Sequence, residues 1–458
     1  MENGIEITPP KENKMGVMPI NRLLLSMSVP MMLSMLVQAL YNIVDSIFVA
    51  QIGENALAGI SLAFPVQNLM IAVGAGTGVG INALLSRSLG EKKFARANAT
   101  AVNGIFLALL SSLAFAVFGL VGAEAFFRLQ TNIPEIVGYG RDYLWVCMVF
   151  SFGLFGQITF ERLLQSTGRT FYSMITQATG AIINIILDPI LIFGYFGLPK
   201  MGLAGAAIAT VIGQIAAMLL AIYFNLRKNH DITLAFKNYR PNGKIIGRIY
   251  TVGVPSILMV AIGSIMVYGL NNILLAFTAT ATAVFGAYFR LQSFVFMPIF
   301  GLNQGMIPIL AYNYGAKRKE RMVKTIRLSV FYAVVLMLAG LAVFQLIPDK
   351  LLLIFNASPG MLDLGIPALR TISLSFIFAG FCVIAVSVFQ ALGNGLLSLI
   401  VSVARQLVVL LPVAFLLSRT GSVNAVWWAF PIAELVSVAF CAYFMKRVYD
   451  REIKLLER

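Results

Sequence analysis

A succession of long apolar runs is the feature of this sequence that most restricts its fold. An α-helix needs about 20 mostly apolar residues to cross the hydrocarbon core of a membrane. Hydrophobic residues make up 59% of the 458 residues and charged ones only 12%, whereas soluble domains are about 25% charged. We therefore predict an all-α polytopic membrane protein with twelve transmembrane helices, and we exclude a soluble enzyme and a disordered chain. The predicted spans are residues 23–50, 56–86, 97–120, 142–160, 170–193, 202–226, 250–276, 281–314, 322–347, 366–390, 396–418 and 424–445.

The basic residues are distributed unevenly between the predicted loops. Loops on the cytoplasmic side of a membrane are rich in lysine and arginine. If both termini are cytoplasmic, most of the 34 basic residues lie on that side, and the predicted outer loops hold only Arg128, Arg141, Lys200, Lys350, Arg370 and Arg419. The net charge of +15 is then explained by topology, with anionic membrane lipid as the partner rather than nucleic acid.

The two halves of the chain are copies of one another. At an offset of 225 residues, matched pairs include Pro30 with Pro255, Gly80 with Gly305, Gly90 with Gly315 and Gln165 with Gln390. We predict two six-helix lobes related by pseudo-twofold symmetry, since an even number of spans makes both copies enter the membrane in the same direction. The predicted divisions are a cytoplasmic N-terminal segment 1–22, an N-lobe 23–226, a cytoplasmic linker 227–249, a C-lobe 250–446 and a cytoplasmic tail 447–458.

Parallel repeats of this kind are typical of secondary transporters, in which two bundles rock about a central cavity. The chain has no nucleotide-binding motif of the G-x-x-x-x-G-K-[ST] type, so energy would come from an ion gradient. Four glycines alternate with other residues between Gly74 and Gly80. Since this run lies inside a predicted span, we interpret it as a site of close helix packing.

Several long motifs lie in or next to the predicted spans, namely YNIVDSIFVA at 41–50, NIILDPILIF at 184–193, GLAGAA at 202–207, GLNQGMIP at 301–308 and YNYGAK at 312–317. They resemble signatures of the multidrug and toxic compound extrusion (MATE) family, and the resemblance is closest to the bacterial branch of DinF-like and MepA-like exporters. It implies a multi-pass protein of the bacterial inner (plasma) membrane that exports cationic or amphiphilic drugs and dyes in exchange for protons or sodium. Such xenobiotic export would confer antibiotic resistance.

Carboxyl groups at mid-membrane depth are costly, and we therefore treat them as candidate functional groups. Tyr41, Asn42 and Asp45 follow the spacing of one helix face, together with Gln38. Asn184 and Asp188 are i, i+4 neighbours in a later span.

Two acids in one dry cleft favour the uptake of a proton. Alternatively, the oxygens of Asp45, Asn184 and Asp188 suit a sodium ion. The family resemblance places the coupling site on these positions and adds Thr210. A simpler interpretation is that Asp188 caps the half-helix after Pro189 and that Asp45 makes only an interhelical hydrogen bond.

Two prolines lie close to these acids. Pro30 precedes the first stripe and Pro189 follows Asp188, so each can act as a hinge that kinks its helix. We expect ion occupancy to change the bend near Pro30.

The second copy has lost both acids, because Leu270 and Val413 occupy the positions equivalent to Asp45 and Asp188. Its predicted buried charges are Arg290, Arg405 and Glu434. Arg405 and Glu434 lie at matching depths, and either a structural ion pair or a role in substrate or ion passage fits them.

A further pair, Glu161-Arg162, lies between two predicted spans. It is interpreted either as a solvated loop pair or as a gate salt bridge.

The sequence offers no enzyme chemistry. Cys147, Cys382 and Cys441 lie far apart in apolar runs, and His230 is the single histidine, so we expect neither a disulfide framework nor a metal cluster. We expect no cofactor other than a coupling ion, H⁺ or Na⁺, and a monomeric protein. The alternative function is a flippase for lipid-linked saccharides or other amphiphiles, and a membrane-embedded enzyme or a channel is disfavoured.

Overall fold

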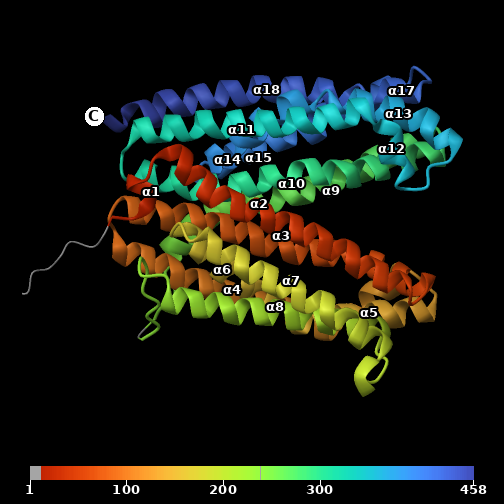
Figure 1. The fold of residues 1–458 in the computed structure, drawn as a ribbon, viewed down its shortest axis with the longest axis horizontal. Coiled ribbons are helices and arrows are strands. Elements are labelled where there is room, and N and C mark those ends of the chain that lie inside the picture. Colours follow the sequence, from red (N-terminus) through yellow and green to blue (C-terminus); the bar gives the residue numbers. More distant parts are fainter. Residues whose placement is uncertain (1–11, 238, 458) are drawn as a thin grey trace, which may run out of the picture.

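A computed structural model describes residues 12–237 and 239–457, and every regular element in these ranges is a helix. The two halves of the chain form two elongated bundles that lie side by side (Figure 1). The first half comprises α1 (Lys14–Val17), α2 (Ile20–Ala50), α3 (Glu54–Gly90), α4 (Phe94–Arg128), α5 (Pro134–Val149), α6 (Phe152–Ser166), α7 (Thr170–Phe193), the 3₁₀ turn η1 (Tyr195–Gly197) and α8 (Gly202–Arg227). The second half comprises α9 (Gly243–Leu275), α10 (Ala279–Gly315), α11 (Lys319–Leu346), α12 (Pro348–Leu353), α13 (Pro359–Ser373), α14 (Phe376–Ala391), α15 (Gly395–Val403), the π-helix η2 (Ala404–Leu410), α16 (Leu411–Ser418), α17 (Val423–Val426), α18 (Ala429–Val448), the π-helix η3 (Tyr449–Ile453) and the 3₁₀ turn η4 (Lys454–Glu457).

The predicted all-α membrane fold is confirmed, with a difference at two spans. Among the described residues, ten helices are long and apolar enough to cross a membrane, and two bent helix pairs bring the number to twelve. The predicted spans 142–160 and 366–390 each straddle one of these bends, of 45° between α5 and α6 and of 50° between α13 and α14. Hydropathy could not reveal the bends because both arms of each pair are apolar.

The backbone repeats at the same offset of 225 residues as the sequence. Lys92 and Lys317 both adopt a φ of 57°, and Gly168 and Gly393 adopt φ of 85° and 90°. The left-handed region is costly for a lysine, so its use at both equivalent turns shows that the two copies share one backbone conformation after α3 and α10.

The two copies touch at the end of the molecule that carries most of the basic loops. We call this end the basic end; it comprises the turns at 91–93 and 316–318, residues 228–237 and 239–242 of the connection between α8 and α9, and residues 449–457. A Cβ atom on Gly90 would lie 1.9 Å from the carbonyl oxygen of Tyr312, and one on Gly315 would lie 2.2 Å from that of Arg87. These two contacts are equivalent under the repeat, and only glycine permits either.

Further glycines continue this contact between the copies toward the middle of the bundles. A Cβ on Gly80 of α3 would lie 2.1 Å from the carbonyl oxygen of Ile249 in α9, and one on Gly305 of α10 would lie 2.4 Å from Ser28 Oγ in α2. A Cβ on Gly76 would lie 2.6 Å from Ile257. The predicted role of the Gly74–Gly80 run in close packing is therefore confirmed for Gly76 and Gly80.

Both ends of the chain are more structured than the predicted segments 1–22 and 447–458 suggest. Residues 1–11 and 458 lie outside the described residues, but α1 and the start of α2 fall within 12–22, and the tail is helical from Lys446 to Glu457. Arg321 donates to the carbonyl oxygens of Met15 and Met18 over 3.0 and 2.8 Å, while Asn13 donates to that of Thr167 over 2.9 Å. The segment around α1 thus connects the two copies at the basic end.

Candidate functional site

A polar cluster inside the first bundle joins three helices. The carboxyl groups of Asp45 (α2) and Asp188 (α7) lie next to each other, and Asp188 is fully buried. The Asn184 amide, oriented to satisfy both neighbours, donates to Asp188 Oδ2 over 2.9 Å and accepts from Thr210 Oγ1 over 3.1 Å. The structure therefore brings together Asp45, Asn184, Asp188 and Thr210.

Aromatic and amide groups surround this cluster. Tyr41, one helical turn before Asp45, interacts with Thr210. Gln67 of α3 donates to the hydroxyl group of Tyr143 in α5 over 2.8 Å, and Tyr143 lies within electrostatic reach of Tyr41 and Asp45. Sequence reasoning missed Gln67 and Tyr143, since a single polar or aromatic residue in an apolar span has no distinguishing pattern.

Asn42 does not belong to the cluster. Its residue is exposed, and its carbonyl oxygen accepts a hydrogen bond from Ser46 Oγ over 2.8 Å. Successive residues on an α-helix are separated by about 100°, so the face that presents Tyr41 and Asp45 to α7 turns Asn42 away. The structure thus places Asn42 outside the cluster, and its part in ion coupling stays a prediction.

The cluster has the chemistry of a site for a small cation. Asp45 Oδ1 and Asp188 Oδ1 are buried without a hydrogen-bond partner among the described residues. Two carboxylates in contact repel each other unless a proton or a cation lies between them, and oxygen ligands suit a hard cation. These residues therefore fit either a proton or sodium, held by Asp45 and Asp188.

The two predicted hinge prolines lie inside long helices. Pro30 falls within α2 and Pro189 within α7, and both helices continue on either side of the proline. A proline removes one backbone hydrogen bond from a helix. The change of bend expected at Pro30 stays a prediction.

Glu161 is a second buried acid of the first bundle, and its interpretation as part of a solvated loop was wrong. The residue lies within α6, is 4% exposed, and accepts hydrogen bonds from Gln157, Thr176 and Gln177 over 3.1, 3.0 and 2.9 Å. Arg162 donates instead to Gln165 over 2.8 Å. The helix α6 continues to Ser166, past the predicted end of the span at 160, so that Glu161 lies among helices.

The second bundle presents a different polar centre. Arg405, in the π-helix η2, lies 3.6 Å from Glu434 of α18, and Glu434 is 7% exposed. Arg290 is exposed, so its prediction as a buried charge was wrong. Cys382 of α14 and Cys441 of α18, distant in sequence, lie near each other, which the spacing of cysteines did not indicate.

Comparisons with known proteins agree with this arrangement. The MatE family matches residues 30–190 and again 255–416, one match in each copy of the repeat. The multidrug export protein MepA of Staphylococcus haemolyticus is 29% identical over 428 residues, which cover 93% of each chain. A FAD transporter of Shewanella oneidensis is 27% identical over 443 residues, covering 94% of this chain and 96% of the relative.

A solved structure described as the outward-facing conformation of a multidrug resistance MATE family transporter superposes with a TM-score of 0.90. Its sequence is 26% identical, and the match covers 98% of this chain and 99% of that one. Matched in both halves and over nearly its whole length, the chain belongs to the MatE family of multidrug efflux transporters.

Proposed function

We propose that the protein exports cationic or amphiphilic drugs and dyes by antiport, driven by a gradient of protons or sodium ions. The observation that carries the proposal is the contact between Asp45 and Asp188 inside the first bundle, since buried acids in membrane proteins mark ion pathways. The similarity to multidrug export proteins supports drugs as cargo.

In this mechanism the two bundles alternate between opening at the basic end and opening at the opposite end. Asp45 and Asp188 bind the coupling ion, with Asn184 and Thr210 orienting the Asp188 carboxyl group. A bound ion shifts the equilibrium between the two states only as far as its affinity differs between them. We propose that ion binding changes the bend of α2 near Pro30 and thereby releases the cargo.

The basic end would face the cytoplasm, because lysine and arginine concentrate on that side of membrane proteins. The chain would then lie in the plasma membrane of a bacterium with both termini in the cytoplasm. We propose that a monomer is sufficient, since each chain contains both bundles.

Reconstitution into liposomes tests the proposal, with pH and sodium gradients imposed separately and efflux of a fluorescent cation such as ethidium recorded. Wild type should respond to one of the two gradients, whereas Asp188→Asn should remain folded and lose gradient-driven efflux. Asp142→Asn is the matched control, because Asp142 is an exposed acid of the same bundle. Full efflux by Asp188→Asn, or transport by wild type that is indifferent to both gradients, contradicts antiport through this pair.

A second candidate function is export of an anionic cofactor, and the similarity to a FAD transporter favours it. The same liposomes, loaded with FAD instead of a dye, decide between the two cargoes. A flippase activity is tested in parallel with a fluorescent lipid-linked saccharide, whose movement between leaflets would replace dye efflux.

A further inference from the structure

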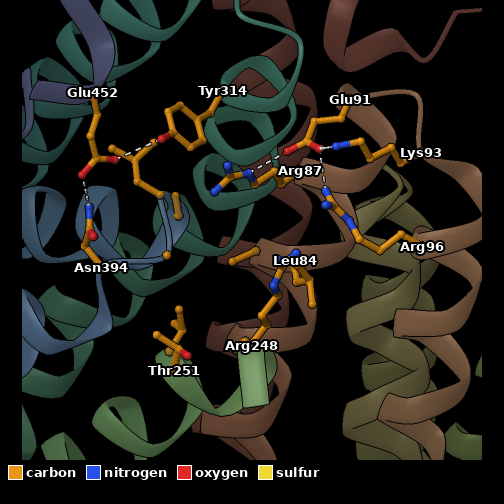
Figure 2. Close-up of a pocket in the computed structure, with 16 residues that line it drawn as sticks. Leu84, Arg87, Glu91, Lys93, Arg96, Arg248, Thr251, Tyr314, Asn394 and Glu452 are labelled. Carbon is orange, nitrogen blue, oxygen red and sulfur yellow. Dashed lines mark hydrogen bonds and ion pairs between the residues drawn. The ribbon is translucent and has the colours of Figure 1, made fainter. Parts of the chain in front are cut away.

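A cavity of about 580 Å³ lies at the basic end between the two copies of the repeat (Figure 2). Ligand sites in proteins have volumes of about 300–1,000 Å³. One wall comes from α3, the turn after it and the start of α4; the other comes from α9, α10, the turn between α14 and α15, and Glu452. A ligand in this cavity would therefore touch both bundles at once.

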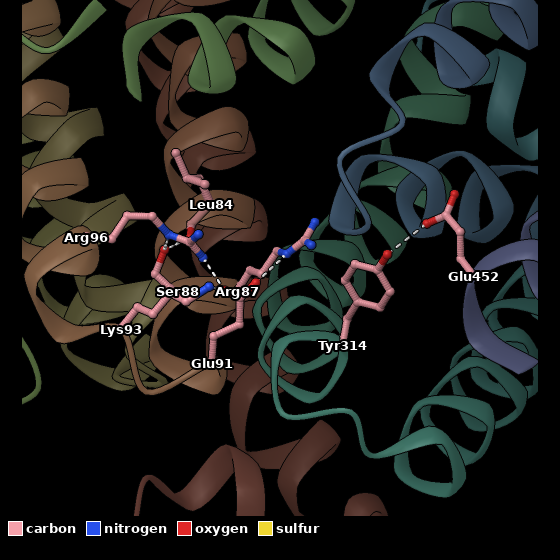
Figure 3. Close-up of polar contacts among 8 residues, drawn as sticks. All are labelled: Leu84, Arg87, Ser88, Glu91, Lys93, Arg96, Tyr314 and Glu452. Carbon is pink, nitrogen blue, oxygen red and sulfur yellow. Dashed lines mark hydrogen bonds and ion pairs between the residues drawn. The ribbon is translucent and has the colours of Figure 1, made fainter. Parts of the chain in front are cut away.

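The wall from the first copy has more positive than negative charge (Figure 3). Glu91 accepts from Arg87, Lys93 and Arg96 at distances of 2.9, 2.7 and 2.8 Å. Burial alone would raise the pKa of Glu91, but the hydrogen bonds from Lys93 and Arg87 and the charge of Arg96 hold this pKa at about 2. Glu91 is thus ionised at any physiological pH, and its one negative charge faces three positive ones.

The opposite wall adds a cation that the protein does not neutralise. Arg248 of α9 lines the cavity and makes no ion pair with any described residue. Glu452 accepts from Asn394 over 2.6 Å and from the Tyr314 hydroxyl group over 3.2 Å, both of them neutral donors. The lining holds four basic and two acidic side chains, so its formal net charge at neutral pH is +2.

Three guanidinium groups retain hydrogen-bond donors that no described residue uses. Arg87 bonds to Glu91 through Nε while its plane stacks on the Tyr314 ring at 4.6 Å, which leaves both terminal nitrogens. Arg96 uses Nε and Nη2 for Ser88 and Glu91, and a guanidinium group carries five N–H donors. Figure 2 shows Arg248 extending from α9 toward Leu84 of α3, so that all three groups border the same space.

We propose that this cavity binds a phosphate group, as a monoester or a diester, and that the bound phosphate holds the basic end closed. Guanidinium groups match phosphate oxygens in a forked geometry. Arg87 and Arg96 belong to one bundle and Arg248 to the other, so a phosphate between them replaces repulsion across the interface by attraction. The site loses one wall when the bundles separate at this end, so the phosphate binds the closed state more tightly and stabilises it.

Binding is measured by the melting temperature of the purified protein in neutral detergent, titrated with inorganic phosphate at constant ionic strength. Wild type should show a saturable rise. Arg248→Gln should weaken the apparent affinity by about tenfold or more, as expected for the loss of a charged hydrogen bond. Lys244→Gln is the matched control, since Lys244 lies one helical turn earlier on α9, is exposed, and does not line the cavity. Arg248→Lys keeps the charge and loses the forked geometry, so its apparent affinity for phosphate should lie between those of Arg248→Gln and Lys244→Gln.

A parallel titration with phosphatidylglycerol in mixed micelles distinguishes the source of the phosphate. A rise with inorganic phosphate that Arg248→Gln removes supports a soluble phosphate ester. A rise with the lipid alone, removed by the same variant, supports a headgroup at the membrane surface. If neither ligand shifts the melting temperature, or if Arg248→Gln responds as wild type and the Lys244→Gln control do, the proposal is overturned. None of these measurements requires transport, so their outcome is independent of the antiport proposal.

Discussion

Replacement of Gly80 by alanine should force the two bundles apart at the basic end. A Cβ atom at this position would lie 2.1 Å from the carbonyl oxygen of Ile249 and 2.9 Å from its carbonyl carbon. Because the obstacle is helix backbone, it cannot rotate away, and α3 and α9 must separate by roughly 1 Å. Overpacking of this kind costs about 1–3 kcal/mol, which corresponds to a roughly 5- to 150-fold change in the ratio of open to closed molecules.

The labelling rate of a buried cysteine can measure this change. Ser28 is fully buried, its hydroxyl group donates to the Leu302 carbonyl oxygen of the other bundle over 3.3 Å, and α10 covers it. Ser28→Cys should react with a soluble maleimide only when the basic end opens, provided that the three native cysteines are replaced by alanine. In this background Gly80→Ala should raise the labelling rate by the factor given above.

Gly286→Ala is the matched control for this experiment. Gly286 lies inside α10, and a Cβ there would meet no atom within 4 Å. Both substitutions gain the helix propensity of alanine, about 1 kcal/mol, so their difference isolates the contact with Ile249. Equal labelling rates in the two variants would refute the view that the glycine contacts hold the basic end closed.

Four further substitutions test the charged groups and a neighbour of the acid pair. Glu91→Gln should lower the free energy of unfolding at pH 7 by about 1 kcal/mol. The pKa of Glu91 in the folded protein is lowered from 4.5 to about 2. The melting temperatures of variant and wild type should therefore converge as pH falls from about 4.5 toward 2. Glu434→Gln should lower the free energy of unfolding by about 3–5 kcal/mol, because it leaves Arg405 without its partner. The double variant with Arg405→Gln should recover part of that loss in thermal unfolding. A normal melting temperature with impaired transport would instead favour a role in substrate or ion passage. Thr210→Val should weaken coupling in the liposome assay less than Asp188→Asn does, because Thr210 contacts Asn184 and only orients the acid pair.

The cost of buried charge identified Asp45 and Asp188 as candidate residues, and the structure places them next to each other. Their role in ion coupling stays a prediction. Asp45 and Asp188 belong to different spans, and their contact followed from the expectation that a membrane interior brings such acids together. Helical periodicity fixes the direction of a side chain around the helix axis only approximately. Asn42 was therefore included with Tyr41 although it points elsewhere.

Features that depend on the path of the backbone could not be predicted. Glu161 is buried because α6 continues to Ser166 and packs this acid against α7, whereas hydropathy ended the fourth span at 160. Arg290 is exposed although it lies in an apolar run, since hydropathy does not distinguish a helix face in the bundle from one outside it. The proximity of Cys382 and Cys441 depends on the packing of α14 against α18, which sequence separation conceals.

The two copies share a backbone conformation, but only the first carries the acid pair. The helix α2 connects this pair with the interface between the two bundles. In the second copy Leu270 is fully buried at the position equivalent to Asp45, so only the first copy carries the acid pair. The same α2 helix that carries Asp45 also packs Ser28 and Met32 against Gly305 and Gly301 of α10, where a Cβ would lie 2.4 and 2.5 Å from its neighbours. A change in the bend of α2 at Pro30 cannot leave these contacts unchanged. An ion bound at the proposed site in one bundle would therefore act on the interface with the other, and a second site would not be required.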